Sequence, residues 1–259
     1  QTCTNDVTAE RSNMKIEITG LTKYYGQLCA VDSLSFSFGS GKLTALVGRN
    51  GSGKTTTIRS LLGLIPMDKG QIIINGLDRP LDLKRTGYLA EERGMFPKEK
   101  VNEQLMFFGC LKGMTAKNAD KAIDYWLGKF DIGQYKKRPL ESLSKGNQQK
   151  IQIIASLIHD PDVIILDEPF SGLDPVNMQM VMDLLIELRD NGKCVLVSSH
   201  QLSLIEQVCE DICIIDRSRR LYYGPVNSLR QARSSGDGRP DESLQDIFLS
   251  LIGEENKNE

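Results

Sequence analysis

A short glycine-rich stretch has the residue types and spacing that bind phosphate. Residues 48–55 read Gly-Arg-Asn-Gly-Ser-Gly-Lys-Thr and fit the pattern G-x-x-x-x-G-K-[ST]. The glycines allow a tight turn, so several backbone N–H groups can point at one anion. Lys54 would bring a positive charge to the outer phosphates of a nucleotide, and Thr55 would offer a hydroxyl to a magnesium ion. The expected nucleotide contacts of this stretch and of the residue after it are Gly48, Arg49, Asn50, Gly51, Ser52, Gly53, Lys54, Thr55 and Thr56.

The segments on either side of this stretch have the patterns of a strand and a helix. Residues 43–47 form a short apolar run, and residues 55–65 place their apolar side chains on one helical face. The N-terminus of such a helix offers N–H groups and a positive dipole end to a phosphate. The alternative is a chance match in a glycine-rich turn, which this strand and helix make less plausible.

Two carboxylates follow a second apolar run. Residues 163–166 are typical of a central parallel strand, and Asp167 and Glu168 come directly after it. A carboxylate in such a place is costly unless it meets a cation. We predict that Asp167 holds magnesium, directly or through water, and that Glu168 polarises an attacking water as a general base. The alternative is an Asp-Glu-Pro turn with no chemical role.

Apolar patterning along the rest of the chain predicts strands interrupted by a helical insertion. Residues 14–19 and 33–38 alternate apolar and polar side chains, which indicates two early antiparallel strands, while 101–160 has helical periodicity. Further strands are expected at 71–75, 86–90, 194–198, 212–216 and 220–223. The expected parts are a flexible leader at 1–13, a nucleotide-binding core at 14–98 and 161–231, a helical signature subdomain at 99–160, and a linker with a short C-terminal helix at 232–259.

Composition narrows the functional classes. A net charge of −2 gives no basic field that would attract nucleic acid, so no nucleic acid partner is expected. No apolar run approaches the roughly 20 residues that a membrane span needs, and no signal-peptide pattern opens the sequence, which favours a cytosolic location. The six cysteines form no CxxC pair and only two histidines are present, so reduced thiols are favoured over a zinc site.

Further motifs complete a resemblance to a known family. Residues 143–149, Leu-Ser-Lys-Gly-Asn-Gln-Gln, are similar to the signature motif of the ATP-binding subunits of ABC transporters, and residues 171–174 resemble the loop after that family's catalytic glutamate. His200 stands where the family has its switch histidine, and Tyr25 where an aromatic ring stacks on adenine. The resemblance covers residues 14–225 in the family's order and spacing. His159 has no such context and is expected to be structural.

The resemblance implies a fold and a dimeric mechanism. The fold would be α/β: a P-loop NTPase core with a mixed β-sheet, an N-terminal antiparallel β subdomain and an inserted α-helical subdomain. Two subunits, identical or homologous, would close head to tail around two ATP molecules with Mg²⁺. The residues that would complete the partner's phosphate site are Ser144, Gly146, Asn147 and Asp174. Ser144 can also be an ordinary N-cap, and the two roles are compatible.

Three positions depart from the usual family pattern. The signature has Lys145 where many members have glycine, and Asn147 where many have glutamine. Glu91 occupies the position of the family's nucleotide-sensing glutamine. A carboxylate there can still supply an oxygen to magnesium or its waters, but it adds a negative charge.

The sequences of residues 87–97 and of the C-terminal end are most similar to those of bacterial exporter subunits of the sodium and antibiotic-efflux type. This implies an ATPase that drives transport through a separate membrane permease, on the inner face of the cell membrane. The permease is expected to dock on residues 91–106, with Met95 and Phe96 as contacts. The alternative is that the apolar set of this region, Met95, Phe96, Leu105 and nearby Phe107, packs the helical insertion onto the core, which is favoured for Leu105. The rival functions are a soluble non-transport ATPase of the same superfamily and a regulatory nucleotide-binding module without turnover.

Overall fold

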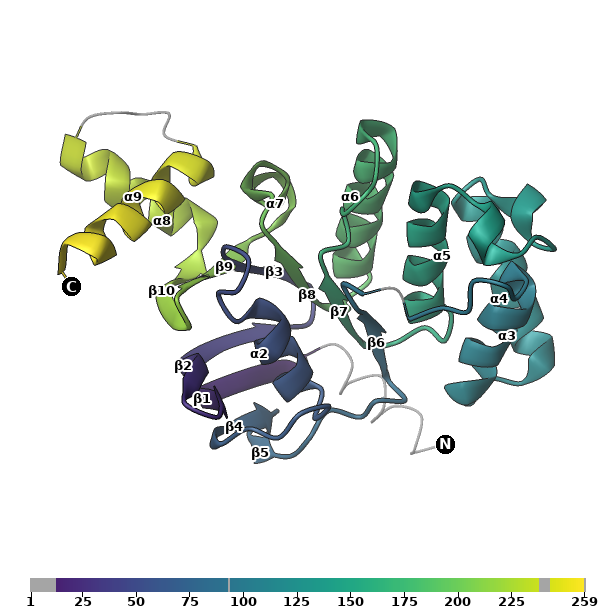
Figure 1. Cartoon of the computed structure of the whole chain (residues 1–259), viewed down its shortest axis with the longest axis horizontal. Coiled ribbons are helices and arrows are strands. Elements are labelled where there is room, and N and C mark those ends of the chain that lie inside the picture. The colour runs from purple at the N-terminus through teal and green to yellow at the C-terminus, as the bar shows by residue number, and fades with distance from the viewer. Residues whose placement is uncertain (1–12, 93, 238–242, 259) are drawn as a thin grey trace. The chain divides into compact units, whose positions relative to one another are not determined.

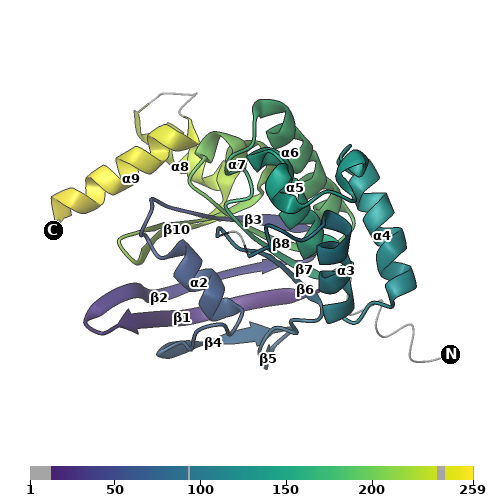
Figure 2. The ribbon, with the colours of Figure 1, turned by 45° about the vertical axis from the view of Figure 1, so that its right-hand side comes forward.

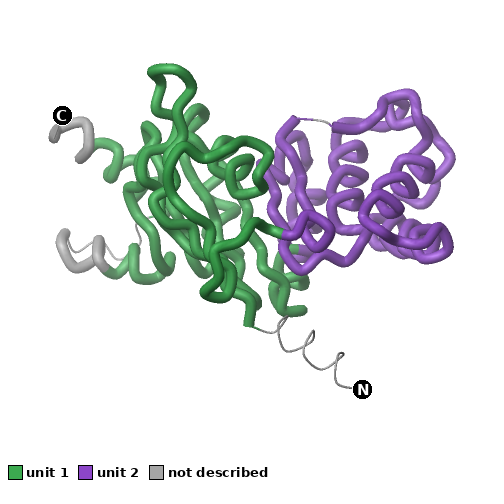
Figure 3. The backbone as a smooth tube through the Cα atoms, turned by 90° about the horizontal axis from the view of Figure 1, so that it is seen from below, with its two compact units in different colours: residues 1–81, 185–259 green, residues 82–184 purple. Residues whose placement is uncertain are grey.

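The computed structural model describes residues 13–92, 94–237 and 243–258 (Figure 1). The expected leader at 1–13 therefore lies, apart from its last residue, outside the described residues. The chain divides into two compact units, Gln1–Leu81 with Leu185–Glu259 as the first and Asp82–Leu184 as the second (Figure 3).

The first unit contains a four-stranded antiparallel sheet (Figure 2). Its strands, in the order β2-β1-β4-β5, are β1 Lys15–Tyr25, β2 Leu28–Gly39, β4 Lys69–Ile74 and β5 Leu77–Asp78. The alternation in the sequence is confirmed, because Ile16 and Ile18 of β1 and Phe36 and Phe38 of β2 are buried. These apolar rows give the sheet one covered face.

A second set of strands in the first unit runs in the order β10-β9-β3-β8. The strands are β3 Lys42–Val47, β8 Cys194–Ser199, β9 Asp211–Asp216 and β10 Arg219–Pro225. β3 is parallel to both β8 and β9, and β10 returns antiparallel to β9. Every residue of β8 and β9 is buried, as a parallel sheet covered on both faces requires.

The first unit has four helices that lie wholly within its described residues. They are α2 Lys54–Leu61, α7 Leu202–Val208, α8 Val226–Asp237 and α9 Leu244–Asn258. α2 ends earlier than the expected Ile65, because Gly63 takes a left-handed φ of 67° and Leu64 N–H bonds back to Arg59 O at 2.9 Å. α8 was not expected, and its helical turns continue into the stretch for which composition indicates a linker.

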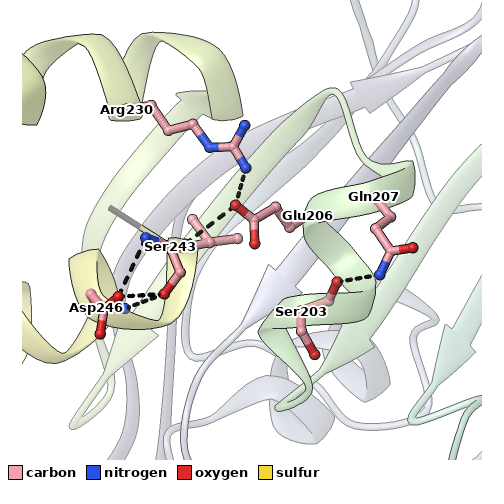
Figure 4. Close-up of polar contacts among 7 residues, drawn as sticks. Ser203, Glu206, Gln207, Arg230, Ser243 and Asp246 are labelled. Atoms are coloured by element: carbon pink, nitrogen blue, oxygen red, sulfur yellow. Dashed lines mark hydrogen bonds and ion pairs between the residues drawn. The ribbon is translucent and has the colours of Figure 1, made fainter. Parts of the chain in front are cut away.

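One carboxylate joins α7 to both C-terminal helices (Figure 4). Glu206 of α7 accepts a hydrogen bond from the Arg230 guanidinium of α8, and its Oε1 also accepts the Leu244 N–H of α9 at 3.4 Å. Ser243 and Asp246 cap the start of α9 reciprocally, with Ser243 Oγ 2.6 Å from Asp246 Oδ2. The C-terminal helices are therefore built into the first unit by polar contacts as well as apolar ones.

The second unit is mostly helical. It contains the parallel strands β6 Thr86–Leu89 and β7 Val163–Asp167, and the helices α3 Val101–Leu111, α4 Ala116–Lys129 and α5 Lys145–Leu157. Short 3-10 turns lie at Gly133–Tyr135 and Leu140–Ser142, and α6 Pro175–Asp190 starts in this unit. Thr115 is the N-cap of α4, because its Oγ1 accepts the Asn118 N–H at 3.3 Å.

The described cysteines are free thiols in different environments. Cys194, Cys209 and Cys213 are buried, Cys29 is half-buried and Cys110 is exposed, while Cys3 lies outside the described residues. Burial raises the pKa of the Cys213 thiol to about 12. None of the helices in the described part of the chain is both long and apolar enough to span a bilayer.

Candidate nucleotide-binding site

The glycine-rich loop joins β3 to α2 in a conformation that only glycine fits at two positions. A Cβ on Gly48 would lie 2.3 Å from the carbonyl oxygen of Ile215. A Cβ on Gly53, which has a φ of 108°, would lie 2.5 Å from the carbonyl oxygen of Ala30. The loop backbone is therefore packed directly against β9 and the start of β2, and its path is fixed before any ligand binds.

The side chains of this loop suit an anion. Lys54 is only 6% exposed, and its Nζ donates to Gly48 O at 2.8 Å and to Arg49 O at 3.3 Å. Ser52 Oγ is buried and has no hydrogen-bond partner among the described residues. The first turn of α2 has no acidic residue. The loop thus presents an ammonium, an unsatisfied hydroxyl and a helix N-terminus, which together fit the phosphates of a nucleotide.

The tyrosines at the end of β1 are both accessible. Tyr25 is 49% exposed and pairs with Leu28 across the hairpin, while Tyr24 is 43% exposed and pairs with Cys29. Lys23 Nζ lies 5.7 Å from the centre of the Tyr25 ring. Either ring has enough free surface to stack on a base, so the choice of Tyr25 stays a prediction.

His200 leaves the sheet beside the phosphate loop. β3 and β8 pair in parallel with Val47 opposite Ser199, so Gly48 and His200 are the next residues on neighbouring strands. His200 is exposed, and the turn after it is held by a 3.0 Å bond from Gln201 N–H to Ser199 Oγ. The first unit therefore brings together the loop and the expected switch histidine.

The second unit brings the three expected acidic residues to one edge. β6 pairs with β7 so that Leu89 lies opposite Leu166, and the chain continues to Glu91 on one strand and to Asp167 and Glu168 on the other. Asp167 is 0% exposed and Glu168 4%, whereas Glu91 is exposed. Glu168 has a φ of 53°, a left-handed conformation that is uncommon for a residue with a side chain.

The expected signature residues open α5. Ser144 is the N-cap, and its Oγ accepts the Asn147 N–H at 3.3 Å, as the sequence predicted. Gly146 lies in the first turn, where an added Cβ would meet nothing closer than 3.8 Å. Packing within the described part of the chain therefore does not require a glycine at this position.

Asp174 has a structural role that the sequence did not indicate. Its Oδ1 accepts the Asn177 N–H at 2.9 Å, and its Oδ2 accepts the Asn177 side-chain amide at 2.7 Å, at the start of α6. The hydrogen bond from the Asn177 backbone is the main cause that holds the pKa of Asp174 below its usual value. Asp174 thus stays ionised as a cap, which leaves its other role a prediction.

Comparison with known proteins decides the family. The family model described as ABC transporter matches residues 31–171. An uncharacterised ABC transporter ATP-binding protein of Methanocaldococcus jannaschii is 45% identical over 215 residues, which are 83% of this chain and 79% of that protein. This chain belongs to the ABC transporter ATP-binding family.

Other relatives of this ABC protein carry more specific names. The Nod factor export ATP-binding protein I of Ralstonia nicotianae is 34% identical over 83% of this chain and 68% of its own length. The linearmycin resistance ATP-binding protein of Bacillus subtilis is 31% identical over 86% of this chain and 72% of its own length.

Solved structures agree on the fold of the ABC protein. An ATP-binding subunit of an ABC transporter matches with a TM-score of 0.81 and 25% identity over 92% of this chain and 99% of that one. A dimeric bacterial ABC transporter cassette matches with a TM-score of 0.75 at 21% identity over 82% of this chain and 98% of that one. The expected α/β fold, with its antiparallel β subdomain and helical subdomain, is thereby confirmed.

The second unit of the ABC protein has exposed aromatic side chains and a cavity lined by residues next to them in sequence. Phe96 is 52% exposed and Phe107 is 51% exposed, whereas Leu105 is completely buried. The cavity, of about 270 Å³, is lined by residues that include Met95, Phe108 and Leu111. Leu105 therefore packs the helical core, Phe96 and Phe107 offer open surface, and Met95 lines the cavity.

Proposed function

We propose that this protein is the ATP-hydrolysing subunit that powers export through a separate membrane permease, docked on the inner face of the cell membrane. The observation that carries the proposal is the phosphate loop, with its fixed backbone and buried Lys54 ammonium at the start of α2. The name of the relative in Nod factor export supports the direction of transport.

Three of the predicted site residues offer oxygen atoms that suit a magnesium–ATP substrate. Thr55 offers a hydroxyl, and Asp167 and Glu91 offer carboxylates, which are the oxygen ligands that magnesium prefers. No group of three or more His, Cys, Asp or Glu side chains in the described ranges could hold a metal ion alone. Magnesium is usually bound through one or two carboxylates together with the phosphates of its nucleotide.

We assign separate roles to the remaining site residues. In the proposed reaction, water attacks the γ-phosphorus of ATP, and the bond between the β- and γ-phosphates breaks to release ADP and phosphate. Lys54 and the loop N–H groups bind its phosphates, and Tyr25 stacks on adenine. Glu168 takes a proton from the attacking water, and His200 contacts the γ-phosphate.

The glycine at position 146 is an argument for the proposed head-to-tail dimer. A glycine in a helix costs roughly 0.5–1 kcal/mol relative to alanine, and nothing in the described chain crowds this position. A residue that weakens its own helix without serving the fold is explained if another molecule must approach its backbone. We propose that this molecule is the ATP of a second, identical or homologous subunit, bound by Ser144, Gly146 and Asn147, with Asp174 at the same interface.

The surface around Phe96, Phe107 and Met95 is the proposed contact for the permease. Half-exposed aromatic rings beside a hollow of about 270 Å³ suit an intracellular helix that inserts side chains. A soluble non-transport ATPase would have no need of this surface.

Measuring phosphate release tests the proposal against a regulatory module without turnover. The parent should release phosphate from ATP with magnesium, and Glu168→Gln should slow release by about 10²–10⁴-fold while ATP stays bound. The Glu168→Gln protein should accumulate as a dimer with ATP in gel filtration, and Lys54→Ala, which should not bind ATP, should stay monomeric. A parent without turnover, or a Glu168→Gln variant with normal turnover, would contradict the proposal.

A further inference from the structure

The turn between β9 and β10 has an unusual backbone. Residues 216–219 form this turn, and Arg217 and Ser218 both have positive φ values, 42° and 72°. Two successive non-glycine residues in this region are strained, and such strain persists only where surrounding contacts hold it. The contacts of the turn therefore show what it is held against.

One set of contacts joins the turn to the phosphate loop. The buried Asp216 carboxylate, 4% exposed, accepts both Arg49 Nε at 2.9 Å and Arg49 Nη2 at 2.8 Å. Ser218 N–H also donates to Ser52 O at 3.3 Å. A fork-shaped pair of this kind fixes direction as well as distance. The Arg49 side chain is thereby turned to β9, and its backbone remains part of the loop.

A second set of contacts joins the same turn to the start of β2. Ser218 Oγ donates to Cys29 O at 2.7 Å, and Asp32 N–H donates to Ser218 O at 2.8 Å. Cys29 is the strand partner of Tyr24, and the next pair in the hairpin is Tyr25 with Leu28. Ser218 thus contacts β2 close to the tip of the hairpin that carries the proposed adenine-stacking ring.

We propose that the Asp216–Arg219 turn is a positioning element that fixes the separation between the adenine-stacking hairpin and the phosphate loop, with Ser218 as its central positioning residue. This inference rests on the proposed binding of ATP. Two subsites held at a fixed separation bind a ligand that spans both more tightly than they bind either half, because the second contact is already in place. Loosening the turn should weaken ATP without weakening a ligand of the phosphate loop alone.

The test compares magnesium–ATP with inorganic tripolyphosphate, which has the phosphate chain but no base. Ser218→Ala removes the bond to Cys29 and keeps both backbone bonds of the turn. The matched control is Arg220→Ala, which removes a hydrogen bond from the same hairpin to Ser35 O, further along β2. Thermal unfolding without ligand verifies that both variants fold. If Ser218→Ala does not fold, Ser218→Gly replaces it, because glycine accepts a positive φ.

Ser218→Ala should weaken ATP by about two- to tenfold, the range of a single lost hydrogen bond, and leave tripolyphosphate affinity unchanged. Arg220→Ala should leave both affinities unchanged. Equal weakening of the two ligands, or no weakening of either, would refute the positioning role while leaving the nucleotide site intact. A parent protein that binds neither ligand would refute the proposed nucleotide site and this inference with it.

Discussion

The rings of Phe96 and Phe107 meet edge to face, with centroids 6.3 Å apart and an interplanar angle of 78°. Phe107 makes a second such contact with Phe108, at 5.4 Å. Phe96 lies in the segment before α3 and Phe107 lies within α3, so the pair fixes an exposed aromatic surface on a rigid helix. A surface of this kind suits a partner better than it suits water.

Changing Phe96 and Phe107 together to serine should separate partner binding from catalysis. The isolated subunit should keep its fold and basal ATPase activity, because both rings are half exposed. Copurification with the permease, and stimulation of ATPase activity by it, should fall. Tyr125→Ser is the matched control, since Tyr125 is 59% exposed on α4 and its ring packs on Trp126, away from the Phe96–Phe107 pair. Unchanged copurification of the double variant would place the docking surface elsewhere.

Replacing each tyrosine of the β1 hairpin in turn identifies the ring that stacks on adenine. Tyr25→Ala should weaken ATP binding by about 1–3 kcal/mol, the range for a stacked base. Tyr24→Ala removes a ring of similar exposure and should have the smaller effect. Nucleotide titration of both variants, with unfolding temperatures for comparison, measures this. A larger loss at Tyr24 would reverse the assignment.

Gly146→Ala should make the protein more stable and less active. Alanine should stabilise α5 by up to roughly 0.5–1 kcal/mol, the range for a helix interior, and outside its own helix and chain neighbours the new Cβ would meet no described atom closer than 3.8 Å. The same methyl group should hinder the approach of a second subunit's ATP. Denaturant unfolding should therefore show a gain in stability, and gel filtration of Gly146→Ala in the Glu168→Gln background should show less ATP-dependent dimer. A fully retained dimer would remove the main support for the head-to-tail contact.

Glu206→Gln should loosen the C-terminal helices from α7. The variant loses the charge of the Arg230 pair, an effect of about 1 kcal/mol for a partly exposed contact, which would lower the melting temperature by about 2–4 °C. Limited proteolysis beyond Pro225 should become faster. Gln207→Ala is the control, because the hydrogen bond of the Gln207 side chain among the described residues goes to Ser203 O within α7 (Figure 4). Equal protease sensitivity of the two variants would show that apolar packing alone holds these helices.

Local patterns predicted most of the fold because most strands have either an alternating or a continuous apolar pattern. Alternation located β1 and β2, and continuous apolar runs located β3 and β7. The short helix α7 and the helix α8 were missed, because α7 has only seven residues and α8 is polar at its end. Neither segment shows a helical stripe long enough to stand out.

The site could be predicted only where its residues lie together in short contiguous motifs. The loop at Gly48–Thr55 and the pair Asp167–Glu168 were found in this way, and their chemical roles remain proposals. The contacts of Asp216 and Ser218 had no such signal, because they link positions more than 160 residues apart in sequence. The cap formed by Asp174 was also not predicted, since the family resemblance implied only a role for Asp174 across the dimer interface.

Because the thiols differ in burial, an exposed cysteine can be labelled selectively. The thiolate is the form that reacts with maleimide, and burial keeps Cys209 and Cys213 protonated near neutral pH. Cys110 is exposed on α3, three residues after Phe107, and so lies on the same helical face. With Cys3 and Cys29 changed to serine, a fluorophore on Cys110 would stand beside the aromatic surface. Its emission would report the arrival of a permease helix in real time, without any new residue being introduced at the interface.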